Sequence, residues 1–389
     1  MDPITVGVIG CGNISDAYFQ GARRFDILKV KACADLREEV AKAQAAKYGV
    51  QSVPFDRLLA DPEIDLVVNL TVPLSHAAIG IEAASAGKHV YSEKPFAVTA
   101  EEARGLMAAA AEHGVRLGCA PDTFMGGAHQ AARKLLDDGV IGRPVGGAVC
   151  VMSRGMEHWH PNPEFFFKRG GGPMLDVGPY YVTELVNLYG PVRRVVASAS
   201  AAFPRRTVTS QPLHGAEIEV EVPTSVHGVL DFANGATVSL SASWDVWTHG
   251  RNPIEIYGTE GSMLVPDPNF FGGTPRVSVR GGGWEDRDIS AHPFGLPNRD
   301  NNGQKVADYR AIGVVDMAWA IRQGRPHRAN ADLALHVLEV LEAFERSSVE
   351  GRHIVIDSAC DRPAAIATGQ GEEVFSGLSG SLLAKAAAV

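Results

Sequence analysis

The stretch Ile4-Thr-Val-Gly-Val-Ile-Gly10-Cys-Gly12-Asn-Ile-Ser15 ("ITVGVIGCGNIS", residues 4–15) decides how this chain begins to fold. Its apolar, β-branched half predicts a strand, and a helix-like segment continues from Ser15 to about Arg24. A glycine turn between a strand and a helix predicts a dinucleotide site, because the backbone can approach a pyrophosphate there and the helix N-terminus attracts it. Ser15 replaces the third glycine of the G-x-G-x-x-G pattern, which makes the match less specific.

A second predicted strand, residues 28–34, ends at Asp35, twenty positions after Ser15. A carboxylate at this position can accept hydrogen bonds from the ribose hydroxyls of NAD and repels the additional phosphate of NADP. Arg37 lies two residues further on and could instead pair with that phosphate. We therefore expect NAD as the cofactor, with NADP as the alternative. The residues of this region expected to bind it are Gly10, Gly12, Asn13, Ile14, Asp35 and Arg37.

Two further apolar runs, residues 65–70 and 89–92, are typical of parallel strands that are buried on both faces. A helix-like segment follows each run, and Thr99 with Glu102 forms a capping box before the second helix. Strands that alternate with helices predict a doubly wound parallel sheet, in which ligands bind beyond the carboxyl ends of the strands. The residues that follow these two strands and are expected at the cofactor are Thr71, Pro73, His76, Glu93 and Lys94.

The pattern changes after about residue 121, where glycine, aromatic and Val/Thr-rich segments replace the alternation. Alternating runs on both sides of the Asn234-Gly235 turn predict antiparallel strands. Helical spacing is found at residues 180–188 and 332–347, so two helices are expected in this region.

Composition excludes several classes of function. The 36 basic and 45 acidic residues give a net charge of −9 without a basic run, which argues against nucleic-acid binding and favours a small-molecule ligand. No apolar run approaches the roughly 20 residues of a membrane span. The N-terminus lacks the pattern of a secretory signal, so a cytoplasmic location is expected. The five cysteines are scattered without Cys-x-x-Cys spacing and predict neither a disulfide framework nor a zinc site.

The chemically dense stretch runs from Glu157 to Glu184. Asp176 and Tyr180 are four positions apart, which at a helix entrance places both on one face, where a carboxylate and a phenol can orient and deprotonate a substrate hydroxyl. His158 and Trp159 are expected to contact the substrate, since aromatic faces suit sugar rings. Two histidines without further ligands do not make a metal site, so no metal is predicted.

Each of these residues also has a simpler interpretation. Lys94 could be a surface residue in a proline turn, and Asp176 could cap the following helix. Tyr180 and the tryptophans could belong to the hydrophobic core.

Three motifs together resemble the Gfo/Idh/MocA oxidoreductases over roughly residues 4–360: Gly10-Cys-Gly12-Asn-Ile, Glu93-Lys94-Pro95, and the three glycines that lead to Asp176. The resemblance implies an α/β protein with an N-terminal Rossmann domain, residues 1–122. It implies an α+β domain over residues 123–389 that binds substrate through a large, open, mainly antiparallel sheet. The outer face of this sheet commonly makes homodimers or homotetramers in the family.

The resemblance also implies roles for residues. Lys94 corresponds to the catalytic lysine of the Glu-Lys-Pro motif, and Asp176 to the aspartate that anchors the substrate. Tyr180 stands where many inositol-dehydrogenase-like members have histidine, while glucose–fructose oxidoreductase is similar to this chain in having tyrosine. Because a phenol has an ordinary pKa of about 10, against about 6.5 for imidazole, it is a poor base at neutral pH unless it is assisted. We therefore expect Tyr180 to act together with Lys94.

The function expected from these features is an NAD(P)-dependent oxidoreductase that acts on a secondary alcohol of a sugar, glycoside or cyclitol. A neutral polyol is expected because no arginine cluster is dedicated to a carboxylate or phosphate, although Arg154 could be one such group. One alternative is an NAD-dependent enzyme that cleaves glycosides through transient oxidation and elimination. The other is a non-catalytic sugar or dinucleotide sensor, which the joint presence of Lys94, Asp176 and Tyr180 argues against.

Overall fold

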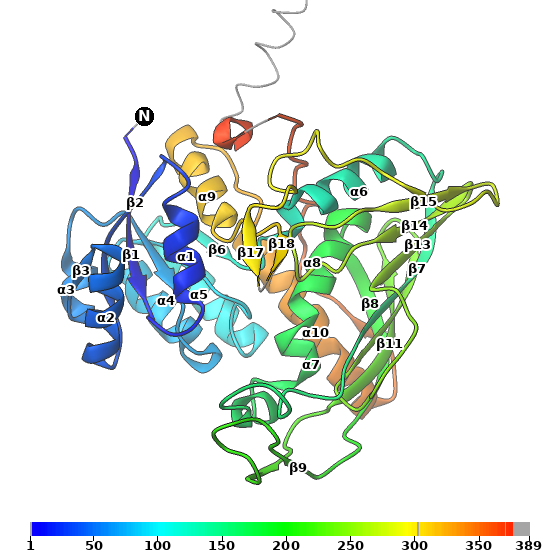
Figure 1. The fold of residues 1–389 in the computed structure, drawn as a ribbon, viewed down its shortest axis with the longest axis horizontal. Coiled ribbons are helices and arrows are strands. Elements are labelled where there is room, and N and C mark those ends of the chain that lie inside the picture. The colour runs from blue at the N-terminus through cyan, green and yellow to red at the C-terminus, as the bar shows by residue number, and fades with distance from the viewer. Residues whose placement is uncertain (1, 302, 370, 376–389) are drawn as a thin grey trace, which may run out of the picture. The chain divides into compact units, whose positions relative to one another are not determined.

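The computed structural model describes residues 2–301, 303–369 and 371–375 (Figure 1). The chain forms two compact units, and their segments alternate along the sequence. The first unit is drawn from residues 1–127, 290–335 and 363–389, and the second from residues 128–289 and 336–362. The domain boundary after residue 122 stays a prediction; the first unit also takes in residues 290–335, which follow that boundary.

A six-stranded sheet forms the centre of the first unit, with the strand order β3-β2-β1-β4-β5-β6. All of its pairings are parallel, which confirms the predicted Rossmann sheet. The order runs outward from β1 in both directions, so β1 and β4 mark the point at which ligands bind in such sheets. The strands are β1 (Ile4–Ile9), β2 (Leu28–Ala34), β3 (Gln51–Ser52), β4 (Leu66–Asn69), β5 (His89–Ser92) and β6 (Leu117–Cys119).

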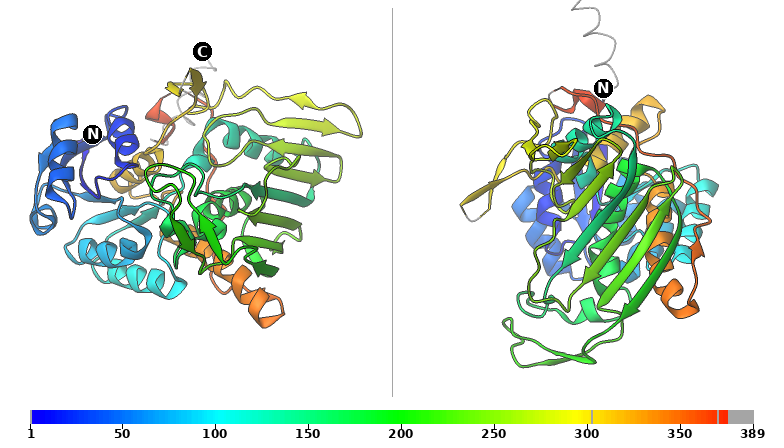
Figure 2. Two further views of the ribbon diagram at one scale, coloured as in Figure 1. Left: turned by 60° about the horizontal axis from the view of Figure 1, so that its bottom comes forward. Right: turned by 90° about the vertical axis from the view of Figure 1, so that its right-hand side faces the viewer.

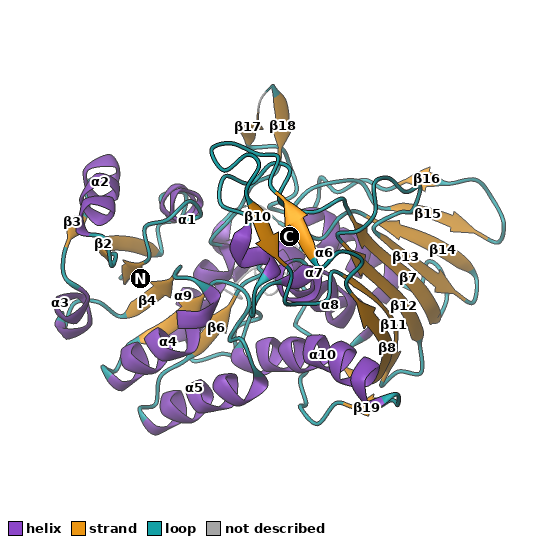
Figure 3. Cartoon of the chain, turned by 90° about the horizontal axis from the view of Figure 1, so that it is seen from below, coloured by secondary structure: helices purple, strands orange, loops and turns teal. Residues whose placement is uncertain are grey.

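Helices connect the strands of this sheet. Helix α4 lies beside α5 (Figure 3) and against β4 and β5. The capping box is present at the start of α5. Thr99 Oγ1 accepts the Glu102 N–H at 3.2 Å, and the Glu102 carboxylate accepts the Val98 N–H at 3.1 Å. The helices of the first unit are α1 (Ser15–Ala22), α2 (Glu38–Tyr48), α3 (Phe55–Ala60), α4 (His76–Ser85), α5 (Ala100–Glu112) and α9 (Ile312–Gln323), with the short turns η1 (Pro73–Ser75), η2 (Thr123–Met125) and η4 (Glu372–Phe375) and the hairpin β17 (Arg299–Asn301) and β18 (Gln304–Val306).

A nine-stranded sheet dominates the second unit, with the order β16-β15-β14-β13-β7-β12-β11-β8-β19. Its pairings are antiparallel except that of β12 with β7, so the expectation of a large, mainly antiparallel sheet is confirmed. The Asn234-Gly235 turn joins β11 to β12 as predicted. The strands are β7 (Pro144–Met152), β8 (Val192–Ser200), β11 (Ser225–Phe232), β12 (Thr237–Ser243), β13 (Ile254–Gly258), β14 (Gly261–Val265), β15 (Arg276–Val279), β16 (Glu285–Asp286) and β19 (Ile354–Val355), with the separate hairpin β9 (Arg205–Thr207) and β10 (Glu217–Glu219).

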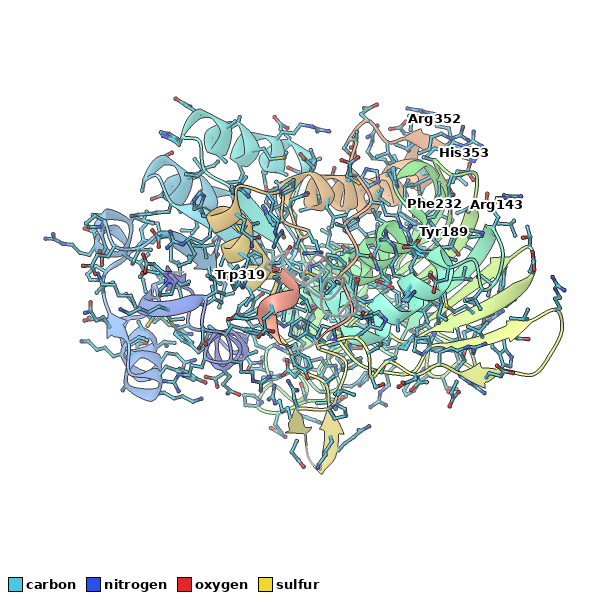
Figure 4. All side chains as sticks on the ribbon, turned by 90° about the horizontal axis from the view of Figure 1, so that it is seen from above. Arg143, Tyr189, Phe232, Trp319, Arg352 and His353 are labelled. Atoms are coloured by element: carbon cyan, nitrogen blue, oxygen red, sulfur yellow. The ribbon has the colours of Figure 1, made fainter. Side chains whose placement is uncertain are left out.

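One broad face of this sheet has no helix in front of it in the described part of the chain (Figure 2, right). From Thr237 to Ala242, alternate residues of β12 are buried and the residues between them are not, as expected for a sheet covered on one side. Every residue of α8 is buried, and its last residue, Tyr189, packs on Phe232 with ring centroids 5.0 Å apart (Figure 4). The helical segments that lie wholly or mostly in the second unit are α6 (Gly127–Asp137), η3 (Glu164–Phe167), α7 (Gly172–Asp176), α8 (Gly178–Tyr189) and α10 (Ala331–Glu350).

The expectation of two helices after residue 121 was wrong, because α6, α7 and α9 were missed. The first seven residues of α9 are buried, so its apolar run has no polar face from which a helical period could be detected. The described residues contain no helix that is long and apolar enough to span a membrane.

Candidate functional site

The glycine turn between β1 and α1 contains two glycines with different local roles. Gly10 has a φ of +92°, and a Cβ placed on it would lie 2.6 Å from the backbone carbonyl of Leu70. Gly10 therefore lets β1 and the chain after β4 come close together. Gly12 is exposed, and a Cβ there would meet nothing within 4 Å. Gly12 thus leaves space just before α1, as the approach of a pyrophosphate requires, while the expected cofactor contacts of Asn13 and Ile14 stay predictions.

Asp35 is tied to this turn by two backbone hydrogen bonds. Its Oδ2 accepts the Cys11 N–H at 2.8 Å and its Oδ1 accepts the Arg37 N–H at 2.9 Å. An ionised carboxylate has about four acceptor positions, so capacity remains for ribose hydroxyls. The Arg37 side chain is 67% exposed, with its Nε 4.0 Å from Asp35 Oδ1. These contacts bring the predicted glycine turn and Asp35 together at one edge of the sheet.

His76 braces the loops that follow β4 and β5. Its Nδ1 lies 2.6 Å from the carbonyl oxygen of Pro95 and its Nε2 lies 2.9 Å from that of Thr71. The ring is 1% exposed, and burial lowers its pKa below the ordinary value despite the two carbonyl contacts, which raise it. Thr71 Oγ1 in turn donates to Asn69 Oδ1 at 2.7 Å. Direct cofactor contact by Thr71, Pro73 and His76 stays a prediction; the observed contacts make His76 a brace within the sheet edge.

Glu93 holds the backbone of Lys94 at the end of β5. The Lys94 N–H donates to Glu93 Oε2 at 2.9 Å, and the Tyr18 hydroxyl of α1 donates to Glu93 Oε1 at 2.8 Å. Glu93 is 7% exposed, Lys94 is half-buried, and the Lys94–Pro95 peptide is cis. The hydrogen bonds of Glu93 therefore hold the turn around Lys94 in place, whereas a surface residue in a solvated proline turn would lack them.

Sequence reasoning missed two charged residues beside Glu93. Nη1 of Arg310 lies 3.6 Å from Asp122 Oδ1 and 3.8 Å from Glu93 Oε1. Asp122 is fully buried, and burial raises the pKa of its carboxyl group to about 6, although Arg310 lowers it. Asp122 follows the short apolar run of β6 by three residues, and a carboxylate at the end of such a run was a usable signal. Arg310 had none, because it belongs to no motif.

In the second unit, Asp176 and Tyr180 lie on two consecutive helices. Asp176 is the last residue of α7, and Tyr180 lies in the first turn of α8, with Val177 between the helices. The prediction of a single helix entrance was therefore wrong in this detail. Val177, not Asp176, is the N-cap residue of α8. Asp176 is half-buried and Tyr180 is 7% exposed.

His158 and Trp159 lie on a segment with several exposed aromatic side chains. His158 contacts Thr209 Oγ1 through Nδ1 at 2.8 Å, and its Nε2 lies 3.3 Å from Glu157 Oε1. Trp159 is 63% exposed, so it does not belong to the core, whereas Trp244 is 2% exposed and packs with Phe167. Among the described residues, no group of three or more His, Cys, Asp or Glu side chains could hold a metal ion.

Arg206, which sequence reasoning did not identify, is a buried residue that holds the segment around Glu157 and His158. Its guanidinium lies 3.0 Å from Glu157 Oε1 and also pairs with Asp245. All three side chains are less than a tenth exposed. Removing one member of such a buried ionic group leaves an uncompensated charge, so Arg206 fixes the backbone that carries His158.

Comparisons with known proteins agree with this arrangement. Residues 4–120 match the model described as "Oxidoreductase family, NAD-binding Rossmann fold", and residues 129–264 match "GFO/IDH/MocA C-terminal domain". Levoglucosan dehydrogenase of Pseudarthrobacter phenanthrenivorans is 29% identical, over 68% of this chain and 74% of the relative. The 1,5-anhydro-D-fructose reductase of Ensifer adhaerens is also 29% identical, over 66% of this chain and 74% of the relative. A solved levoglucosan dehydrogenase complex with NADH and L-sorbose has a TM-score of 0.79 at 25% identity, over 92% of this chain and 100% of the other.

Proposed function

Because the chain belongs to the Gfo/Idh/MocA family of NAD-binding oxidoreductases, we propose that it transfers a hydride between a secondary alcohol of a sugar, glycoside or cyclitol and a nicotinamide cofactor. The observation that carries the proposal is the pairing of Glu93 with Lys94. Glu93 fixes the Lys94 peptide at 2.9 Å, at the same sheet edge as the glycine turn and Asp35. The sugar dehydrogenases and reductases among the relatives support the substrate class.

The residues of the first unit fit a dinucleotide. The open position at Gly12 and the start of α1 would take the pyrophosphate, and Asp35 would accept the ribose hydroxyls. NAD is the cofactor we propose, because a carboxylate at Asp35 repels a 2′-phosphate; NADP stays possible through Arg37. The cofactor supplies the hydride acceptor and donor, while the protein positions and polarises the substrate.

We propose that Lys94, Asp176 and Tyr180 act on the reacting hydroxyl group. Asp176 would accept a hydrogen bond from a neighbouring substrate hydroxyl and thereby orient the ring. Tyr180 and Lys94 would share the proton that leaves the reacting hydroxyl, because an unassisted phenol is a weak base at neutral pH. The exposed Trp159 and the tethered His158 would contact the sugar ring.

The test is a screen of sugars, glycosides and cyclitols with NAD and with NADP, monitored as nicotinamide reduction. The wild-type protein should reduce NAD with at least one neutral polyol. Lys94→Ala should lose about a thousandfold or more in kcat while it still binds NAD, since proton transfer typically contributes 10²–10⁴-fold. Lys42→Ala is the matched control, because Lys42 makes only an exposed pair with Glu38, and its activity should not change.

Two results would contradict the proposal. Tight NAD binding without turnover across the whole panel would favour the sensor, and aglycone release without net NADH would favour the glycoside-cleaving enzyme. Equal loss of activity in Lys94→Ala and Lys42→Ala would remove Lys94 from the chemistry.

We also propose a cytoplasmic homodimer or homotetramer. The five cysteines form no disulfide with one another, which fits a reducing compartment. The broad face of the nine-stranded sheet that no described helix covers is the surface we assign to the subunit interface. Native mass spectrometry of the purified protein measures the subunit number, and a monomer at micromolar concentration would contradict this assignment.

A further inference from the structure

Arg310 brings a positive charge from a distant part of the sequence to the residues that precede Lys94. Its guanidinium lies between two carboxylates, 3.6 Å from that of Asp122 and 3.8 Å from that of Glu93. The side chains of Arg310 and Glu93 are 12% and 10% exposed, and the side chain of Asp122 is not exposed. Two buried carboxylates repel each other and lose hydration, so a cation is needed where they meet.

The backbone of Arg310 is fixed on both sides. A Cβ added to Gly21 of α1 would overlap the Arg310 carbonyl oxygen, so this helix packs directly on the Arg310 backbone. Ala311 has a φ of +83°, and α9 begins at the next residue. The Gly313 N–H then donates to Asp122 Oδ2 at 3.1 Å. The guanidinium is therefore attached to a backbone that α1 and Asp122 hold in place.

The Glu93 carboxylate cannot rotate without breaking a hydrogen bond. One of its oxygens accepts the Lys94 N–H at 2.9 Å, and the other accepts the Tyr18 hydroxyl at 2.8 Å. If the positive charge of Arg310 were removed, Glu93 and Asp122 would face each other as like charges. Rotation of Glu93 toward solvent, away from Asp122, would relieve this repulsion and would disturb the peptide of Lys94.

We propose that Arg310 is a positioning residue for Lys94, which it holds in place through the Glu93 carboxylate. The inference rests on the proposed role of Lys94 in proton transfer. Arg310 does not touch the substrate in this scheme. It keeps Glu93 in the orientation that joins the Lys94 peptide to Tyr18 of α1, the helix that follows the glycine turn.

The experiment compares the full-length variants Arg310→Gln and Arg310→Lys with the wild-type protein. The first readout does not need turnover: competitive acetylation of Lys94 with acetic anhydride over a pH series, quantified by mass spectrometry. In Arg310→Gln the pH profile of Lys94 acetylation should differ from that of the wild-type protein, because Glu93 no longer holds the Lys94 peptide in place. With an active sugar, kcat should fall about tenfold or more, while the affinity for NAD should stay within about threefold. Arg310→Lys should restore most of both properties, since it keeps the charge.

The matched control is Arg328→Gln. Arg328 pairs at 2.6 Å with Asp316, a residue of α9 that is buried as Asp122 is. Among the ion pairs and hydrogen bonds of the described residues, Arg328 contacts neither Glu93 nor Lys94. Arg328→Gln should lower stability without changing the Lys94 acetylation profile. If Arg310→Gln does not fold, Tyr18→Phe removes only the hydroxyl that holds the other Glu93 oxygen. It should produce a smaller change in the Lys94 acetylation profile, because Glu93 keeps its contact with Arg310.

The outcomes separate this inference from the proposed function. An unchanged Lys94 acetylation profile in Arg310→Gln, or in Tyr18→Phe where the former does not fold, would overturn the positioning role even if the enzyme oxidises sugars. An equal change in Arg328→Gln would overturn it as well, because the effect would then be general loss of stability. A shifted profile in a protein that turns over no sugar would support the positioning role and contradict the function.

Discussion

The backbone N–H of Lys94 donates to one oxygen of the Glu93 carboxylate at 2.9 Å, and the other oxygen of Glu93 accepts the hydroxyl of Tyr18. The segment that precedes the proposed catalytic lysine is thereby joined to α1. Because α1 also carries the proposed pyrophosphate site at its start, a single carboxylate links the two functions of this sheet edge.

Alanine substitutions of Gly10 and Gly12 should affect different properties, the first stability and the second NAD binding. Gly10→Ala places a Cβ 2.6 Å from the Leu70 carbonyl at a φ of +92°, so it should lower the free energy of unfolding. We expect a loss of about 2–4 kcal/mol from positive φ and overpacking together. Gly12→Ala meets nothing within 4 Å and should leave this free energy within about 0.5 kcal/mol. It should instead weaken NAD binding about tenfold, because the methyl group occupies the path of the pyrophosphate. Urea denaturation and an NADH fluorescence titration measure the two effects, and equal destabilisation in both variants would contradict this division.

The charge of Asp35 should set the preference for NAD. Asp35→Asn keeps an acceptor for the Cys11 N–H but removes the negative charge. The ratio of kcat/KM for NADP to that for NAD should rise about tenfold or more, since a like-charge contact with the 2′-phosphate is relieved. Arg37→Ala serves as the complement and should lower the same ratio. A ratio that does not respond to Asp35→Asn would place cofactor choice elsewhere.

The buried carboxyl group of Asp122 should make stability depend on pH. Burial raises its pKa from 3.8 to about 6 in the folded protein. A raised folded pKa favours the protonated form, so its stabilising contribution is complete below about pH 4 and is lost as the pH rises through about 6. The loss should amount to about 3 kcal/mol, at 1.36 kcal/mol for each pKa unit. In urea unfolding over this range, the stability of the wild-type protein relative to Asp122→Asn should fall as the pH rises and then level off. Parallel curves for the two proteins would show that Asp122 does not titrate there.

His129 and Glu184 form a buried pair in the second unit that should respond to pH near neutrality. His129 Nδ1 lies 3.3 Å from Glu184 Oε1, and neither side chain is exposed. Burial lowers the pKa of His129, but the Glu184 carboxylate outweighs it, so the pKa is raised above its ordinary value of 6.5. The pair therefore stabilises the fold fully below about pH 6.5, and this contribution is lost as the pH rises through the raised pKa.

Glu184→Gln should remove this dependence. It should lower the free energy of unfolding by about 3 kcal/mol at pH 6, and by less in alkaline solution, because it leaves a buried histidine without its counter-charge. Thermal and urea unfolding at pH 6 and in alkaline solution measure how much stability Glu184→Gln loses in each condition. Glu164→Gln, at an exposed position, is the control. A loss that is the same at both pH values would mean that the pair is not ionised.

Local pattern was enough to predict the first sheet. Each strand from β1 to β5 apart from the two-residue β3 was expected within a residue of its observed bounds, because buried parallel strands are continuous apolar runs. The Thr99 cap and the Asn234-Gly235 turn were predicted for a similar reason: their hydrogen bonds join residues close together in the sequence. The NAD-binding oxidoreductase family also followed from short motifs, and the comparisons confirm it.

The sequence by itself thus determined the alternation of strands and helices in the first unit and the family of the protein. It also led to the expectation that Lys94, Asp176 and Tyr180 carry the chemistry. Only the tertiary structure decided that residues 290–335 return to the first unit and that Arg310 comes to lie beside Glu93 and Asp122. The physical reason is that a buried ion pair is selected by three-dimensional proximity and leaves no period or spacing in the chain. The helix α9 was missed for a related reason, since its first seven residues are buried on all sides and leave no polar face from which a helical period could be detected.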